Sequence, residues 1–257
     1  MFTPEERARL RSDLLGSGQR DARITGAAVT GSLATNTEDE WSDIDLAFGV
    51  TEAGEVPNVL SDWTRHLYEA NSVLHHFDVQ SGPWTYRVFL LANTLQVDLA
   101  FVAASQFRAL APSFRLVVGS ANEPCHLPPP SATDLIGMGW LYALHVRSAI
   151  ARNRLWQAEY MISGMRDQAL ALACLRRNLP AVQGRGFHML PSEVTAGLEP
   201  SLVRELAPAE LSRAFRTVTA AFLCEVKHAD AELGQRLQGV LMELTEVPSA
   251  SPKRDSG

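Results

Sequence analysis

The pattern of hydrophobic and polar positions changes near residue 120. Before this point, short apolar runs are separated by Gly, Pro, Asn and Ser, which is typical of β-strands joined by turns. Apolar stripes at helical spacing after Thr3-Pro4 and after Pro57 predict two helices in the same region. Strands are expected at residues 23–30, 42–50, 73–80, 85–92, 95–101 and 114–118, and helices at residues 4–15, closed by Gly16 to Gly18, and 58–71.

Helical spacing dominates after a proline-rich stretch at residues 121–132, which we interpret as a stiff linker between two domains. The polar tail, residues 248–257, is predicted to be disordered. The expected fold class is α+β, with a small mixed β-sheet flanked by helices in residues 1–120 and a C-terminal α-helical bundle domain in residues 133–247. Helices of the bundle are expected at residues 133–153, 155–178, 192–198, 201–206 and 208–244.

One polar motif interrupts the N-terminal strand pattern. Gly31-Ser32 follows an apolar run, and the pair Asp43 and Asp45 comes ten residues later. Residues two apart on a strand share a face, so the two carboxylates lie side by side and repel unless a cation sits between them. Hard divalent ions prefer such oxygen ligands. Gly31 allows close backbone approach, and Ser32 can open a helix whose free N–H groups hold a phosphate.

A third carboxylate, Asp98, lies within an apolar run of strand length. A charged group there is costly unless it is paired or bound to a metal. The alternative for Asp98 is a pair with an arginine such as Arg87. The alternative for the whole motif is a Gly-Ser turn followed by a surface hairpin with acidic edges.

Gly31-Ser32, the spaced pair Asp43 and Asp45, and the later strand residue Asp98 together resemble the DNA polymerase β-like nucleotidyltransferase superfamily. The closer resemblance is to bacterial nucleotidyltransferases that adenylylate aminoglycoside or lincosamide antibiotics. It implies that residues 1–120 form the nucleotidyltransferase domain and that the helical domain binds substrate.

The resemblance also implies a chemistry. Two Mg²⁺ ions would be held by Asp43, Asp45 and Asp98, with ATP as co-substrate. Gly31 and Ser32 would contact its phosphates. Asp98 is also a candidate for the base that takes a proton from the attacking hydroxyl.

The helix expected at residues 155–178 offers two further candidates, Glu159 and Arg166, on the face opposite its apolar stripe. They fit an ordinary amphipathic helix with a solvated face equally well. On the functional interpretation, Arg166 contacts the triphosphate, and Glu159 accepts a hydrogen bond from a substrate hydroxyl or amine. Related enzymes use acidic residues of their second domain in this way, so Glu159 competes with Asp98 for the catalytic role.

The amino-acid composition limits the kinds of molecule that the protein is expected to bind. The net charge is −6 and no basic run is present, which disfavours a nucleic-acid partner and suits a cationic small substrate. Three cysteines do not make a disulfide framework. Without a signal segment or a long apolar run, a cytoplasmic protein with no membrane partner is expected, as a monomer or homodimer.

The leading hypothesis is a nucleotidyltransferase that moves AMP from ATP to a hydroxyl of a small molecule and releases pyrophosphate. One alternative keeps this chemistry but modifies a protein or an RNA, as toxin–antitoxin nucleotidyltransferases do. Another is a nucleotide-binding regulator without turnover.

Overall fold

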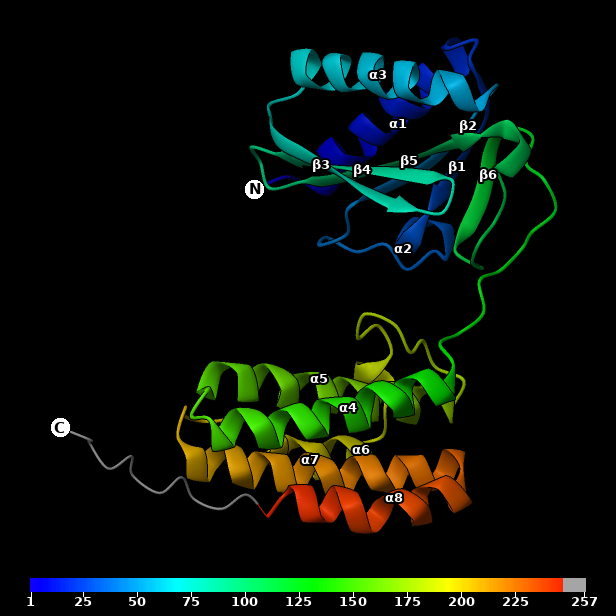
Figure 1. Ribbon diagram of the computed structural model, residues 1–257. Helices are drawn as coiled ribbons and strands as arrows, with labels where there is room; N and C mark the ends of the chain where they lie inside the picture. The colour runs from blue at the N-terminus through cyan, green and yellow to red at the C-terminus, as the bar shows by residue number, and fades with distance from the viewer. Residues whose placement is uncertain (247–257) are drawn as a thin grey trace. The chain divides into compact units, whose positions relative to one another are not determined.

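The computed structural model describes residues 1–246, so the predicted disordered tail, residues 248–257, lies outside the described residues. The chain divides into two compact units, Met1–Leu127 and a second that begins at Pro128 (Figure 1). The first unit is built around a six-stranded sheet and the second from helices alone. The expected α+β fold class is therefore confirmed. Within the described residues, no helix is both long and apolar enough to cross a membrane.

The sheet of the first unit has the strand order β3-β4-β5-β2-β1-β6. Strands β2 and β5 run parallel, whereas their other neighbours pair antiparallel. The strands are β1 Ile24–Thr30, β2 Ile44–Val50, β3 Val73–Ser81, β4 Trp84–Leu91, β5 Gln96–Ala103 and β6 Phe114–Gly119, and the helices are α1 Pro4–Arg20, α2 Gly31–Ala34 and α3 Val56–Ala70. The short 3₁₀ turns are Ala53–Glu55 and Ala104–Gln106.

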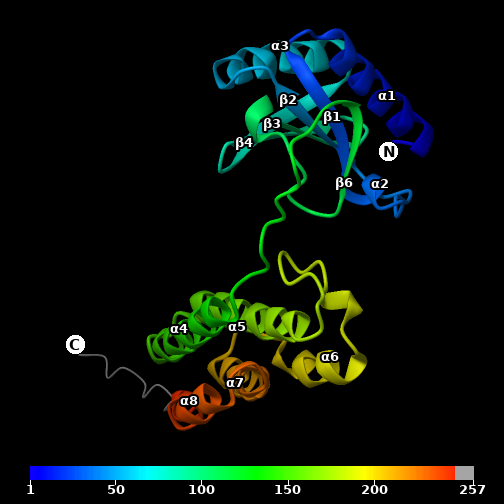
Figure 2. The same ribbon diagram turned by 90° about the vertical axis from the view of Figure 1, so that its right-hand side faces the viewer.

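The two faces of the sheet differ in character. Helices α1 and α3 lie together on one face (Figures 1 and 2), and the main apolar core of this unit forms beneath them. The rings of Phe48, Trp63 and Phe101 meet there at centroid distances of 4.7 to 5.5 Å. Because strand side chains alternate, Asp45 and Asp98 point to the other face, between fully buried neighbours such as Leu46 and Leu99.

The first helix does not end at Gly16 to Gly18 as predicted; α1 continues to Arg20. Gly18 serves as a contact point with the sheet, because a Cβ added there would lie 2.9 Å from Cε1 of Phe48. The glycine lets the helix pass close to the sheet, at a cost of only about 1 kcal/mol in helix propensity.

The second unit is a bundle of helices (Figure 2), and these helices share an apolar core. Its helices are α4 Ala132–Ala151, α5 Leu155–Leu175, α6 Ser192–Leu198, α7 Pro208–Ala229 and α8 Ala231–Leu244, with 3₁₀ turns at Phe187–Met189 and Glu199–Ser201. The single long helix predicted at residues 208–244 is wrong. Asp230 has an extended backbone, and its side chain accepts a hydrogen bond from the amide of Leu233, so it caps a new helix.

The short helix predicted at residues 201–206 is also wrong. Two arginines take the carbonyls that such a helix would need: Arg166 donates to the oxygen of Ser201, and Arg213 donates to the oxygen of Leu202. Leu202 itself is extended, with ψ of 128°. Side-chain donors have therefore replaced backbone donors in this segment.

Candidate metal centre

Three aspartates meet on the face of the sheet opposite α1 and α3. Parallel pairing of β2 with β5 places Asp45 directly beside Asp98. Asp43 precedes β2 by one residue, and its carboxylate joins the other two, so that one oxygen from each lies within 4.8 Å of the others. The spacing of two between Asp43 and Asp45 and the pairing of adjacent strands together produce this cluster.

A neutral amide contacts two of these carboxylates. Gln96 Nε2 lies 3.0 Å from Oδ1 and 3.2 Å from Oδ2 of Asp98, and 3.4 Å from Oδ2 of Asp43. Sequence reasoning missed Gln96, although it lies two residues before Asp98 on the same strand and therefore shares its face. Within residues 1–246, neither Asp43 nor Asp98 forms an ion pair with a basic side chain.

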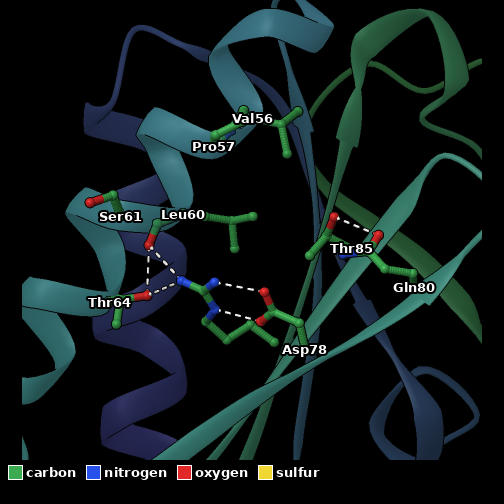
Figure 3. A pocket seen from close by; sticks show the side chains of 9 residues that line it. Val56, Pro57, Leu60, Ser61, Thr64, Asp78, Gln80 and Thr85 are labelled. Atoms are coloured by element: carbon green, nitrogen blue, oxygen red, sulfur yellow. Dashed lines mark hydrogen bonds and ion pairs between the residues drawn. The ribbon is translucent and has the colours of Figure 1, made fainter.

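The alternative that paired Asp98 with Arg87 is wrong. Arg87 donates to both carboxylate oxygens of Asp78, at 2.7 and 2.8 Å, and to the hydroxyl of Thr64 at 2.7 Å. These groups line a pocket between α3 and strands β3 and β4, on the helix-covered side of the sheet (Figure 3). Asp78 and Arg87 are directly opposite each other on β3 and β4, which brings their side chains to one face.

Electrostatics sets Asp98 apart from the paired acids. Burial raises the pKa of Asp98 to about 6, the amide of Gln96 opposes this rise, and the nearby charge of Asp43 adds to it. By contrast, Arg87 lowers the pKa of Asp78. A carboxylate that is half-buried beside another carboxylate is stabilised by a cation, and a divalent ion meets that need most directly.

Gly31 fits closely against this cluster. Its φ of +62° lies in the left-handed region, and a Cβ added to it would come within 2.0 Å of Oδ2 of Asp45. Only glycine can adopt this positive φ and lie this close to Asp45 without strain. The helix that follows begins at Gly31 and is short, with Thr30 rather than Ser32 at its N-cap position. Ser32 is therefore the second residue of α2 and does not cap it.

The donor set fits a hard divalent cation. Three carboxylate oxygens from Asp43, Asp45 and Asp98 can approach one point, and the amide of Gln96 and the backbone at Gly31 lie close to them. Oxygen-only ligands favour Mg²⁺, Mn²⁺ or Ca²⁺ over the metals that histidine and cysteine select. The three aspartates are thus positioned to hold a metal ion.

The remaining candidates, Glu159 and Arg166, belong to α5 of the second unit and are joined through Ser163. The hydroxyl of Ser163 donates to Oε1 of Glu159 at 2.7 Å, and Nη2 of Arg166 donates to that hydroxyl at 2.8 Å. Nη1 of Arg166 reaches the carbonyl of Ser201 at 3.0 Å. Arg166 therefore fixes the segment after α6 within its own unit.

Comparison with known proteins gives a remote structural likeness. No family model matches the chain, and no curated protein matches it. Among solved structures, an aminoglycoside 6-adenyltransferase from Bacillus subtilis matches with a TM-score of 0.42 and 14% sequence identity, covering 95% of this chain and 99% of that chain. A likeness this remote decides neither substrate nor chemistry.

Proposed function

We propose that this protein is a Mg²⁺-dependent nucleotidyltransferase that moves AMP from ATP to a hydroxyl of a small molecule and releases pyrophosphate. An aminoglycoside- or lincosamide-type antibiotic is the leading acceptor. The observation that carries the proposal is the cluster of Asp43, Asp45 and Asp98, in which like charges are gathered against the close-fitting backbone turn at Gly31. A phosphate-binding turn next to a divalent-cation site is what phosphoryl chemistry requires.

In this proposal Asp43 and Asp45 hold both ions, and Asp98 is a ligand of the second. When bound, Mg²⁺ supplies charge neutralisation on the triphosphate and polarises the attacking oxygen. Gly31 permits the chain to approach the phosphates closely, and Ser32 offers its N–H and hydroxyl to a phosphate oxygen. The protein contributes position and charge.

The bond changes are those of a simple displacement. The acceptor oxygen forms a bond to the α-phosphorus, and the bond from that phosphorus to the oxygen bridging to the β-phosphate breaks. Pyrophosphate leaves with that oxygen. The hydroxyl proton passes to a carboxylate, and Asp98, whose carboxylate lies with those of Asp43 and Asp45, is the group proposed to take it.

For the second unit we propose that Glu159 binds the acceptor. One of its carboxylate oxygens is engaged by Ser163, and Oε2 has no hydrogen bond within the described residues. That oxygen is available to a hydroxyl or ammonium group, in keeping with the acidic net charge of the chain. A role for Arg166 at the triphosphate stands as a weaker proposal, because both of its terminal nitrogens already have local partners.

The test is pyrophosphate release from ATP and Mg²⁺ against a panel of aminoglycosides and lincosamides. Wild-type protein is compared with Asp43→Asn and with Asp13→Asn, the same substitution at an exposed position of α1. Release with at least one acceptor, lost in Asp43→Asn and kept in Asp13→Asn, supports the proposal. ATP binding without release across the panel would redirect it to a protein or RNA acceptor, or to a regulator without turnover.

A further inference from the structure

The backbone of Asp43 lies outside the strand pairing that holds the other two aspartates. The ladder between β2 and β5 begins at Ile44, whereas Asp45 and Asp98 are fixed within it. Asp43 is the last residue of the connecting loop, residues 35–43, which links α2 to β2. The position of the Asp43 carboxylate is therefore set by whatever holds the end of this loop.

The loop is held from α1 by a buried arginine. Arg7 is only 3% exposed, and its Nη1 donates to the carbonyl oxygens of Asp39 and Ser42, at 2.7 Å each. The carbonyl of Ser42 is part of the planar peptide group that ends at the Cα of Asp43. Fixing that oxygen therefore fixes the plane from which the Asp43 side chain departs.

The loop is also closed by its own hydrogen bonds. Oδ1 of Asp39 accepts from the hydroxyl of Ser42 at 2.9 Å and from the amide of Trp41 at 3.0 Å. These contacts define a turn but do not attach it to the rest of the unit. Arg7 supplies that attachment, since it joins both ends of the turn to α1.

A second arginine one helical turn away provides a natural contrast. Arg11 forms an ion pair with Glu38, and Nε of Arg7 lies 3.2 Å from the same carboxylate. Within residues 1–246, the hydrogen bonds of the Arg11 side chain reach Glu38 and no backbone carbonyl of the loop. Arg7 and Arg11 therefore share the charge contact, and Arg7 alone makes the carbonyl contacts beside Asp43.

We propose that Arg7 is a positioning residue for the metal centre, which holds the peptide between Ser42 and Asp43 so that the Asp43 carboxylate stays with those of Asp45 and Asp98. This inference rests on the proposed function, in that the three aspartates bind a divalent cation. Replacing a residue that orients a metal ligand without binding the metal itself commonly lowers metal affinity by about 10- to 100-fold.

The experiment measures Mn²⁺ dissociation constants by electron paramagnetic resonance, with no nucleotide present. The expected dissociation constant of Arg7→Met is about tenfold above that of the wild type. Arg11→Met, the matched loss of a neighbouring arginine, is expected to stay within about twofold of the wild type. Asp43→Asn reports loss of a ligand, and far-UV circular dichroism verifies that each variant is folded.

The outcomes separate this inference from the proposed function. Wild-type protein that binds no Mn²⁺ overturns both. Binding that is weakened by Asp43→Asn but unchanged in Arg7→Met overturns the positioning role alone. An equal loss in Arg11→Met also overturns it, because the ion pair with Glu38 would then be responsible. If Arg7→Met does not fold, Arg7→Lys is measured in its place. Because one ammonium group is less able to span both carbonyls, the Mn²⁺ dissociation constant of Arg7→Lys is expected to be raised. An unchanged dissociation constant in this variant overturns the positioning role.

Discussion

Two groups of predicted site residues meet very different neighbours in the structure. Asp43, Asp45 and Asp98 bring like charges together, and a neutral amide is the side chain found between two of them. Glu159 and Arg166 carry opposite charges and are joined through the hydroxyl of Ser163. The first group is positioned to hold a cation, whereas the second has hydrogen-bond partners within its own unit.

This difference predicts opposite responses to substitution. Gathering carboxylates raises the free energy of the folded state, so neutralising one of them relieves repulsion while removing a ligand. A hydrogen-bonded chain of complementary groups lowers that free energy, so breaking it costs stability. Substitutions in the acidic cluster should therefore lower activity without lowering stability. Substitutions in the group formed by Glu159, Ser163 and Arg166, called the α5 group below, should lower stability, and any loss of activity should accompany that loss.

The largest expected effect is the loss of turnover in Asp45→Asn. The substitution keeps the size of the side chain but removes a charged ligand, and a loss on the order of a thousandfold, or about 4 kcal/mol, is expected in the rate of pyrophosphate release. A variant that retained a near-wild-type rate would exclude catalysis by metal ions at these aspartates.

A smaller effect is expected from Gly31→Ala, which inserts a methyl group against Asp45. The added Cβ lies 2.0 Å from Oδ2 of Asp45, so the carboxylate must move, and Mn²⁺ affinity should fall by about tenfold. Gly82→Ala is the matched control, because Gly82 has a similar φ of +56° but no atom within 4 Å of the added Cβ. Each substitution should cost about 1–2 kcal/mol in backbone strain. Equal Mn²⁺ affinity in both variants would contradict close contact between Gly31 and the metal centre.

Substitution in the α5 group should change stability and leave metal affinity unchanged. Arg166→Met removes hydrogen bonds to Ser163 and Ser201, and we expect a loss of about 1–2 kcal/mol in the free energy of unfolding, measured with urea. Mn²⁺ affinity should not change. Arg147→Met, at an exposed position of α4, should stay within about 0.5 kcal/mol of the wild type. A raised KM for ATP without loss of stability would instead place Arg166 at the triphosphate.

Features that depend on the spacing of polar and apolar residues along one strand could be predicted from the sequence. The spacing of Asp43 and Asp45 predicted that these two side chains share a face, and the apolar run around Asp98 predicted a third carboxylate on a strand. Most strands of the first unit were predicted to within two residues of their observed ends for the same reason.

Features that depend on strand register or on distant backbone contacts were not predictable. The partner of Arg87 is Asp78, and this follows only from the register of β3 against β4. Arg7 reaches loop carbonyls more than thirty positions away, and no local pattern marks it. The break at Asp230 had a readable signal, an aspartate that can cap a helix, but continuous helical spacing outweighed it.

The smallest expected effect is on the pH dependence of the melting temperature, and it distinguishes Asp98 from Asp78, which lie on opposite faces of the same sheet. The folded-state pKa of Asp98 is raised to about 6, so the folded protein binds more protons than the unfolded chain between about pH 4 and pH 6, and stability falls as pH rises through that window. Arg87 lowers the folded-state pKa of Asp78, so its contribution is present above the unfolded-state pKa and is lost as the pH falls. In the absence of metal, Asp98→Asn should therefore raise the melting temperature at pH 7, whereas Asp78→Asn should lower it. The Asp98→Asn difference should shrink toward pH 4, whereas the Asp78→Asn difference should shrink only below about pH 4. A lowered melting temperature for Asp98→Asn at pH 7 would mean that the carboxylate cluster is already neutralised by the protein itself.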